Sequence, residues 1–177
     1  MIKATETKLK GCFILEPTIH RDERGYFFES YNHRDFSEAI GKEVNFVQDN
    51  QSFSKMGVLR GLHFQKGEHA QAKLISVLDG KIQDVVVDLR KDSPTFKQHL
   101  SIELDSMDKK QLFIPRGCAH GFLTLSETAT VLYKCDNYYN REAEGGIRFD
   151  DEGLGIEWAM GLDKVLISDK DFGLSYF

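Results

Sequence analysis

The sequence predicts an all-β protein, built as an antiparallel sandwich or barrel with a few short helices. From residue 72 to 135, short runs alternate apolar with polar residues, and turn-forming residues separate these runs. Strands and turns recur at about the interval expected of such a fold. The chain also contains thirteen Phe and six Tyr but only three Pro, a composition that argues against disorder.

The strands are predicted in five runs. They are "KLISVLDGKIQDVVVDL" from residue 73, "KQHLSIELD" from 97, "KKQLFIP" from 109, "HGFLTLSE" from 120 and "TATVLYKCDNYY" from 128. We expect Asp79-Gly80 to supply the positive φ angles of a tight hairpin turn. One helix is predicted before residue 150, in "DFSEAIGKE" from Asp35, with Ser37 as its cap and Gly41 as its stop. The tail from Asp150 is expected to form loops with one or two short helical turns.

Length, charge and cysteine content limit the possible classes. A chain of 177 residues can bury a sizeable core, and we expect one domain over residues 1–177. A net charge of −5 without a basic block argues against binding to nucleic acid or to an anionic membrane. Cys12, Cys118 and Cys135 are odd in number and lack CxxC spacing, so a reducing cytoplasm fits best. No apolar run approaches the ~20 residues needed to span a bilayer.

A small barrel with histidines on inward strand positions indicates a cupin-type jelly roll. Metal-binding cupins place an HxH pair and a Glu on one segment and a further His after a Pro-x-Gly turn. Here His63 stands at the first position, Gln65 replaces the second His, and "PRGCAHGF" supplies His120. Glu68 and His69 lie in the following loop, but a transition metal usually needs about three or four protein ligands. We therefore expect no bound metal and no cofactor.

Histidines in a barrel without a metal can act as acid and base. A neutral imidazole can take a proton from a carbon acid, provided that nearby donors stabilise the enolate. His63 is the candidate base, and Lys73 and His120 are the candidate enolate donors. Taken alone, His63 is more readily explained as a hydrogen-bonded core histidine or a surface histidine. Together with Arg60, however, these groups are too many to bury without a ligand, because each needs a partner.

Several segments together resemble the dTDP-4-dehydrorhamnose 3,5-epimerase family of metal-free cupins. They are "DERGYFFESYN" (22–32), "FVQDNQS" (46–52), "VLRGLHFQ" (58–65), "IPRGCAHGF" (114–122) and "LYKCDNYY" (132–139), followed by "EGGIRFDDEGLGIEW" and "SDKD". The likeness covers nearly the whole chain in order. It implies that His63 is the proton-abstracting base, that Asp171 pairs with it, and that Tyr133 donates the proton on the opposite face. Lys73 and His120 would surround the C4 carbonyl of the substrate.

The resemblance also implies a nucleotide site and a dimer. The residues that match the family's nucleotide-binding positions are Arg24, Glu29, Gln48, Asp49, Asn50, Arg60, Glu144 and Lys170. Tyr138 or Tyr139 is expected to stack on the thymine, and Asp84 is a weaker candidate for orienting His120. The implied active form is a homodimer whose N-terminal strands cross between subunits.

The implied reaction is the 3,5-epimerisation of dTDP-4-dehydro-6-deoxy-D-glucose in dTDP-L-rhamnose biosynthesis, which supplies lipopolysaccharide or cell-wall polysaccharide. The ketone acidifies the hydrogens on C3 and C5, so one base and one opposed acid can invert either centre. Two alternatives remain: an enzyme that epimerises one carbon or isomerises the keto sugar, and a non-catalytic sugar-nucleotide-binding cupin. Retention of His63, Tyr133 and Asp171 favours an enzyme, because a binding module needs no base and acid on opposite faces.

Overall fold

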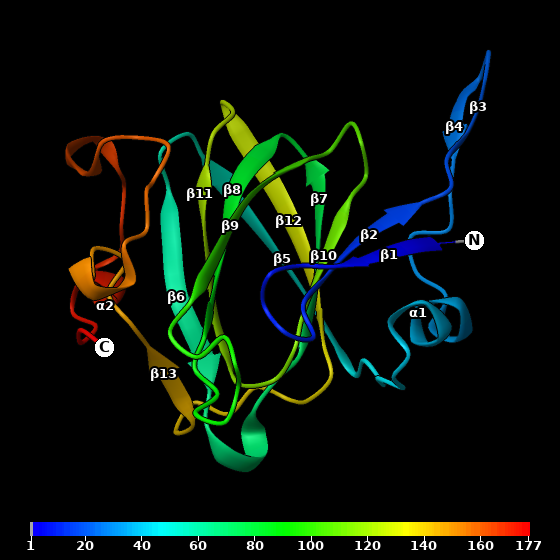
Figure 1. The fold of residues 1–177 in the computed structure, drawn as a ribbon. Coiled ribbons are helices and arrows are strands. Elements are labelled where there is room, and N and C mark those ends of the chain that lie inside the picture. The colour runs from blue at the N-terminus through cyan, green and yellow to red at the C-terminus, as the bar shows by residue number, and fades with distance from the viewer. Residues whose placement is uncertain (1) are drawn as a thin grey trace.

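The computed structural model describes residues 2–177, and two antiparallel sheets form its body (Figure 1). The six-stranded sheet runs in the order β1 (Ile2–Glu6), β2 (Phe13–Pro17), β10 (Gln111–Ile114), β7 (Lys73–Asp79), β12 (Thr128–Cys135) and β5 (Gln48–Lys55). The five-stranded sheet runs in the order β13 (Glu144–Gly146), β6 (Leu59–Gln65), β11 (Cys118–Thr124), β8 (Lys81–Asp88) and β9 (His99–Asp105). This is a cupin-type jelly roll, which confirms the predicted fold class.

Each of the five predicted runs contains a strand, but the Asp79-Gly80 turn does not make the predicted hairpin. β7 pairs with β10 and β12, whereas β8 pairs with β9 and β11, so the turn carries the chain from one sheet to the other. Only Gly80 of the pair has a positive φ, 78°. A Cβ at this position would lie 2.1 Å from the Thr128 carbonyl oxygen. The glycine is therefore required by close packing as well as by backbone angle.

The core lies on both faces of the five-stranded sheet. Along β8, Ile82 and Val86 belong to a cluster between the sheets, while Val85 and Val87 belong to a cluster on the outer face. The outer cluster includes Ile147 and Leu154 from the C-terminal part of the chain. This arrangement explains the continuous apolar run in β8, because a strand buried on both faces does not alternate.

Helix α1 (His33–Ile40) covers a third cluster beside the six-stranded sheet, to which it contributes Phe36 and Ile40. The helix begins before the predicted start, and its cap is Asn32, whose side chain accepts a hydrogen bond from the backbone N–H of Asp35. The prediction of Ser37 as cap was therefore wrong, because Ser37 lies inside the helix. Gly41 ends the helix in the left-handed conformation (φ 67°), as predicted.

The C-terminal tail passes along the five-stranded sheet without forming a further sheet. It contains single 3-10 turns at Glu152–Leu154 and Leu162–Lys164 and the four-residue helix α2 (Asp169–Phe172). The prediction of loops with short helical turns is confirmed, with one more turn than expected. A 3-10 turn at Gly67–His69 (η1) follows β6. Within residues 2–177, no helix is long and apolar enough to cross a membrane.

The small hairpin of β3 (His20–Asp22) and β4 (Gly25–Phe27) projects from the body of the molecule (Figure 1). The hairpin carries exposed aromatic side chains, with Tyr26 52% and Phe27 68% exposed. Arg24 lies at its tip and binds Asp22 within the same hairpin. Exposed aromatic side chains on a projecting hairpin are typical of a surface that another chain covers.

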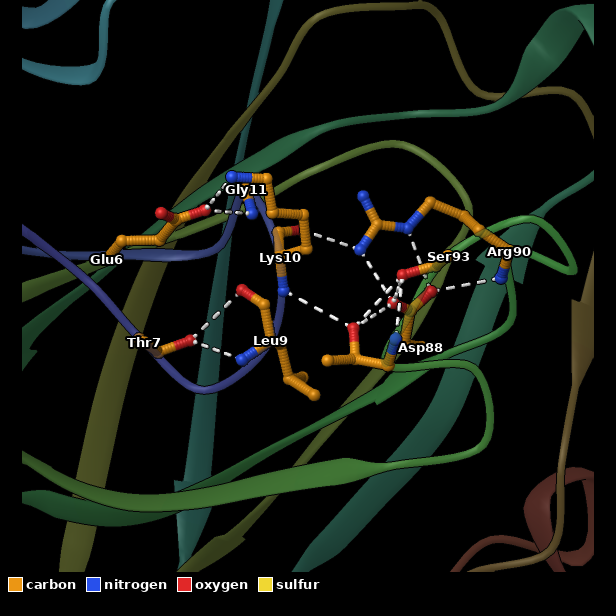
Figure 2. Close-up of polar contacts among 9 residues, drawn as sticks. Glu6, Thr7, Leu9, Lys10, Gly11, Asp88, Arg90 and Ser93 are labelled. Carbon is orange, nitrogen blue, oxygen red and sulfur yellow. Dashed lines mark hydrogen bonds and ion pairs between the residues drawn. The ribbon is translucent and has the colours of Figure 1, made fainter.

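A buried carboxylate, Asp88, joins three loops at one end of the barrel (Figure 2). Its oxygens accept hydrogen bonds from Arg90 Nε at 2.8 Å, Arg90 Nη2 at 2.7 Å and Ser93 Oγ at 2.6 Å. Arg90 Nη2 also donates to the Lys10 carbonyl oxygen in the β1–β2 loop, at 2.6 Å. The Arg90 side chain packs on Gly117, where a Cβ would lie 2.6 Å from Arg90 Cγ. The cluster therefore supports the turn that leads into β11.

Candidate active site

A cavity of about 330 Å³ opens between the two sheets and the C-terminal tail. Most of the predicted catalytic and binding side chains line it, although they come from separate strands and from α2. Its lining consists of Ser52, Arg60, His63, Lys73, His120, Gly121, Phe122, Tyr133, Glu144, Ser168, Lys170 and Asp171. The structure thus brings the five predicted catalytic residues to one place.

His63 and Asp171 form a close pair in this cavity. His63 lies in β6, and its Nε2 is 2.6 Å from Asp171 Oδ1, although 108 positions separate the two residues in sequence. The other oxygen of Asp171 accepts a hydrogen bond from the Gly61 backbone N–H at 3.2 Å. Ser168 caps α2 by accepting from the Asp171 N–H. The carboxylate is therefore held by its own helix and by the strand that carries His63.

The environment keeps Asp171 ionised. Burial acts to raise the pKa of this carboxyl, but the hydrogen bonds from His63 and from the Gly61 N–H outweigh burial, so the pKa lies below its ordinary value. An ionised carboxylate can only accept a hydrogen bond, so His63 Nε2 carries the proton in this pair. The second ring nitrogen, Nδ1, then has a free lone pair and is the basic atom of the imidazole.

A second His–carboxylate pair lies deeper in the barrel. His120 in β11 faces Asp84 in β8, with 2.8 Å between His120 Nε2 and Asp84 Oδ2. Asp84 is fully buried and His120 is 8% exposed. His120 is also the direct antiparallel partner of His63 in the β6–β11 ladder. The two histidines therefore sit side by side on neighbouring strands, each with its own carboxylate.

Lys73 and Tyr133 face this pair of histidines from the opposite sheet. The two residues lie in β7 and β12, which are adjacent strands. Burial lowers the pKa of Lys73, and the negative charge of nearby Asp84 partly offsets this effect. Burial raises the pKa of Tyr133, which keeps the phenol protonated near neutral pH. The cavity thus has a basic imidazole on one wall and a protonated phenol on the other.

A smaller cavity of about 150 Å³ adjoins the first one and shares His63, Lys73, Tyr133 and Glu144 with it. Its remaining lining residues are Gln48, Asn50, Phe64, Gln65, Gln71 and Tyr139. At its edge, Glu144 accepts hydrogen bonds from Lys170 Nζ at 2.6 Å and Tyr139 OH at 3.0 Å. The two cavities together form a divided pocket, and three of the candidate catalytic groups line both compartments.

Four predicted nucleotide-binding residues lie outside both linings. Arg24 is on the projecting hairpin, and Glu29 lines a separate cavity beside α1. Asp49 pairs with Lys134, with 3.0 Å between its carboxylate and Nζ. Tyr138 is 66% exposed, whereas its neighbour Tyr139 lines the smaller cavity.

Sequence reasoning missed several residues that shape the pocket. Phe122 follows His120 closely in β11 and lines the main cavity, and Gln71 lines the smaller one. Gln65, which we considered only as a lost metal ligand, lines the smaller cavity and accepts a hydrogen bond from the Asn140 N–H at 2.9 Å. The strand alternation of "HGF" could have indicated Phe122. Nothing in the local sequence marks Gln71.

The side chains in this pocket suit acid–base chemistry better than metal binding. Among residues 2–177, no three His, Cys, Asp or Glu side chains gather closely enough to hold a metal ion. The position of the lost cupin ligand, Gln65, offers only an amide. The fold and the pocket are therefore those of a cupin-type enzyme, with paired imidazoles, carboxylates and a phenol in its cavity.

Comparison with known proteins identifies the family. Residues 6–177 match the model of the dTDP-4-dehydrorhamnose 3,5-epimerase family, and the chain belongs to this family. It is 54% identical over 158 residues to the dTDP-4-dehydrorhamnose 3,5-epimerase of Salmonella typhimurium, covering 89% of this chain and 86% of that one.

Solved structures of the family superimpose closely. The epimerase from Elizabethkingia anophelis gives a TM-score of 0.96 at 52% identity, covering 99% of this chain and 96% of that one. The epimerase from Legionella pneumophila, solved in complex with dTDP-4-keto-L-rhamnose, gives 0.95 at 43% identity, covering 99% and 93%.

Proposed function

We propose that this chain, acting as one domain over residues 1–177, catalyses the 3,5-epimerisation of dTDP-4-dehydro-6-deoxy-D-glucose to dTDP-4-dehydro-L-rhamnose. Family membership supports the reaction. The observation that carries the proposal for these residues is the pairing of His63 with Asp171 in the cavity that Tyr133 also lines. An isomerisation of this kind needs a base, an acid and enolate stabilisation, and no redox cofactor.

His63 acts as the base through Nδ1. Asp171 accepts a hydrogen bond from the Nε2–H of His63, and this bond fixes the tautomer. The carboxylate also stabilises the imidazolium that forms when Nδ1 takes a proton from C3 or C5. The electron pair of the broken C–H bond moves into the C4 carbonyl and gives an enolate. Lys73, which lines the same cavity, donates a hydrogen bond to the enolate oxygen, and His120 in its imidazolium form donates a second one through Nδ1, because its Nε2 faces Asp84.

Tyr133 completes each inversion by returning a proton to the opposite face of the same carbon. Burial raises the pKa of Tyr133, so the phenol holds its proton until the strongly basic enolate carbon accepts it. Exchange with solvent then removes the proton from His63 and restores the phenol. Because the same ketone acidifies C3 and C5, one pair of groups serves both carbons in succession.

The nucleotide occupies the smaller cavity and the cationic edge of the larger one. Arg60 and Lys170 bind the diphosphate, since a guanidinium presents a planar fork to phosphate oxygens. Gln48 and Asn50 line the smaller cavity and bind the nucleoside with Tyr139 as a stacking face. Glu144 joins the two compartments through its bonds to Lys170 and Tyr139. Asp49 and Tyr138, which lie outside the lining of both cavities, contact the nucleotide from the edge of the pocket.

The proposal is tested by incubating the protein with dTDP-4-dehydro-6-deoxy-D-glucose and following the ring-proton couplings by NMR. We expect inversion at both C3 and C5. Inversion at C3 or C5 alone would identify a single-site epimerase, and migration of the carbonyl would identify a ketoisomerase. Tight binding of dTDP without any change in the sugar would identify a binding protein.

We further propose that the active form is a homodimer with exchanged N-terminal arms. The projecting hairpin with exposed Tyr26 and Phe27 supports this assembly, as does the absence of Arg24 and Glu29 from the lining of both cavities. A mixture of Arg24→Ala and His63→Asn chains tests it. If arms exchange, a mixed dimer contains one site with both native residues, and mixing restores activity. Mixing that leaves both variants as inactive as they are alone would contradict the exchange.

We propose a cytoplasmic location and a role in supplying dTDP-L-rhamnose for lipopolysaccharide or cell-wall polysaccharide. The three cysteines are free and buried, as expected in a reducing compartment. Fractionation of the cells that produce the protein, with a cytoplasmic marker enzyme as control, tests the location. Recovery in the membrane or extracellular fraction would contradict it.

A further inference from the structure

The helix that carries Asp171 is too short to fix the position of this carboxylate by itself. Helix α2, which carries this carboxylate, has only four residues, and an isolated helix of that length is not stable in water. The pairing with His63 nevertheless requires the carboxylate at 2.6 Å from the imidazole. Contacts outside the helix must therefore fix its position.

Arg148 provides the most extensive of these contacts. Its Nη1 donates to the carbonyl oxygen of Phe172, the residue directly after Asp171, at 2.5 Å. Its guanidinium lies over the rings of Phe172 and Tyr176, with 4.4 Å and 5.0 Å to the ring centroids. The backbone N–H of Arg148 also donates to the Ser175 carbonyl oxygen at 3.0 Å. One residue thus holds the tail on both sides of the end of α2.

The guanidinium is itself held in place. Asp150 accepts from Arg148 Nε at 2.8 Å and from Nη2 at 2.7 Å, a two-point contact that fixes the plane of the group. The Arg148 side chain is only 13% exposed, so solvent weakens these contacts less than those of a surface arginine. Asp150 therefore fixes the orientation of the Arg148 guanidinium independently of its contacts with the tail.

Arg148 is also tied to the strand that carries His63. It follows β13, in which Gly146 is the direct partner of His63. The next residue, Ile147, exchanges two backbone hydrogen bonds with Leu62, of 2.9 Å and 3.2 Å. The segment from 144 to 148 therefore runs beside β6 and reaches the tail through Arg148. It is a further connection between the strand of His63 and the tail, beside the Gly61–Asp171 and Glu144–Lys170 hydrogen bonds.

We propose that Arg148 is a positioning residue that holds Asp171 against His63, and that it acts on the reaction only through this carboxylate. This inference rests on the proposed function for its kinetic consequences, but the structural part concerns the tail alone. Arg148 lies outside the lining of both cavities, so it acts without touching the substrate. The tail is thereby an ordered part of the active site.

The kinetic test uses Arg148→Lys, which keeps the charge and loses the planar fork. We expect kcat to fall about 10-fold to 100-fold, because small displacements of a catalytic group cost this much, while the Kd for dTDP changes less than about 2-fold. Phe172→Leu, which keeps the carbonyl and loses the ring, should lower kcat by about 2-fold to 5-fold. Arg34→Ala is the control, since Arg34 is exposed and donates a hydrogen bond to Asp35 of its own helix.

The decisive comparison is the double variant Arg148→Lys with Asp171→Asn. If Arg148 acts through Asp171, the double variant is no slower than Asp171→Asn alone. Multiplication of the two losses would overturn the proposal, as would an unchanged kcat in Arg148→Lys.

Hydrogen exchange separates this inference from the proposed function. The amides from residue 169 to 177 should exchange faster in Arg148→Lys than in the native protein and the Arg34→Ala control. Faster exchange in a chain without epimerase activity would support the positioning role of Arg148 and reject the proposed epimerase function. Unchanged exchange would reject the positioning role, whatever the activity.

Discussion

Replacing Asp88 by Asn should destabilise the fold strongly without touching the active site. The Asp88 side chain is fully buried. Its carboxylate accepts five hydrogen bonds, from Arg90 N, Nε and Nη2, from Ser93 Oγ and from Thr95 Oγ1. An asparagine offers a single acceptor oxygen, and its amide would face either the Arg90 fork or the cluster of donors on Oδ2. At least one guanidinium N–H is left without an acceptor in either orientation.

The expected magnitude follows from the loss of one partner of a buried ion pair. Such losses cost about 3–5 kcal/mol, and we expect the low end, about 3 kcal/mol, because the two hydroxyl groups can turn and accept from the new amide. For a chain of this size each kcal/mol lowers Tm by roughly 2–4 °C, so Tm should fall by roughly 6–12 °C. Asp92→Asn is the matched control, an exposed aspartate in the same loop, and should change stability by less than ~0.5 kcal/mol.

The pH dependence of the stability difference between the native protein and Asp88→Asn identifies the cause of that difference. Burial acts to raise the pKa of Asp88, but the hydrogen bonds from Arg90, Ser93 and Thr95 outweigh it and hold the pKa well below its ordinary value. A carboxyl whose pKa is depressed on folding stabilises the native state above the unfolded pKa of ~3.9, and the stabilisation is lost as the pH falls toward the folded value. Urea unfolding at one protein concentration should therefore show the full difference at pH 7 and a smaller one at pH 3.5. An Asp88→Asn protein as stable as the native one at pH 7 would refute this reasoning.

Further predictions concern the active site. His63→Asn should lower kcat by about 10² or more, the usual contribution of a general base, while calorimetry should find the Kd for dTDP nearly unchanged; full activity would exclude His63 as the base. Tyr133→Phe should slow or misdirect reprotonation while His63 still abstracts a proton, so label exchange measured by mass spectrometry should outlast net epimerisation; equal loss of both would contradict the assigned donor role. Activity should survive prolonged incubation with EDTA, because only two of the cupin ligand positions hold a histidine; loss of activity that one specific metal restores would contradict this expectation.

The fold was predictable because its strands carry a strong local signal. The alternation in "TATVLYKC" and the apolar run around Val86 depend only on which faces of each strand are buried. The order of apolar and polar residues within a strand indicates those faces directly. Connections were less predictable. Asp79-Gly80 has the residues of a hairpin turn, but whether the next strand joins the same sheet depends on the packing of both layers. Likewise Asn32 and Ser37 are both good caps, and the packing of Phe36 and Ile40 against the six-stranded sheet decides between them.

The candidate active site was predicted from the resemblance to a family, not from residue spacing. The strand pattern indicates that His63 and His120 face inward, but nothing in the local sequence links His63 to a carboxylate 108 positions away. That contact depends on the path of the tail, which has no periodic pattern to predict. The contacts of Arg148 with Phe172 and Tyr176 were missed for the same reason. Long-range contacts of irregular segments are the part of this site that only the folded chain reveals.

The central claim, that one base and one acid invert two carbons, is tested most directly with deuterium. The protein is incubated with dTDP-4-dehydro-6-deoxy-D-glucose in D₂O, and label at C3 and C5 is followed by NMR and mass spectrometry. Both C–H bonds must break during double epimerisation, so we predict deuterium at both carbons of the inverted product, with both labels lost in His63→Asn. Label at a single carbon, or at both carbons in the absence of His63, would contradict the account.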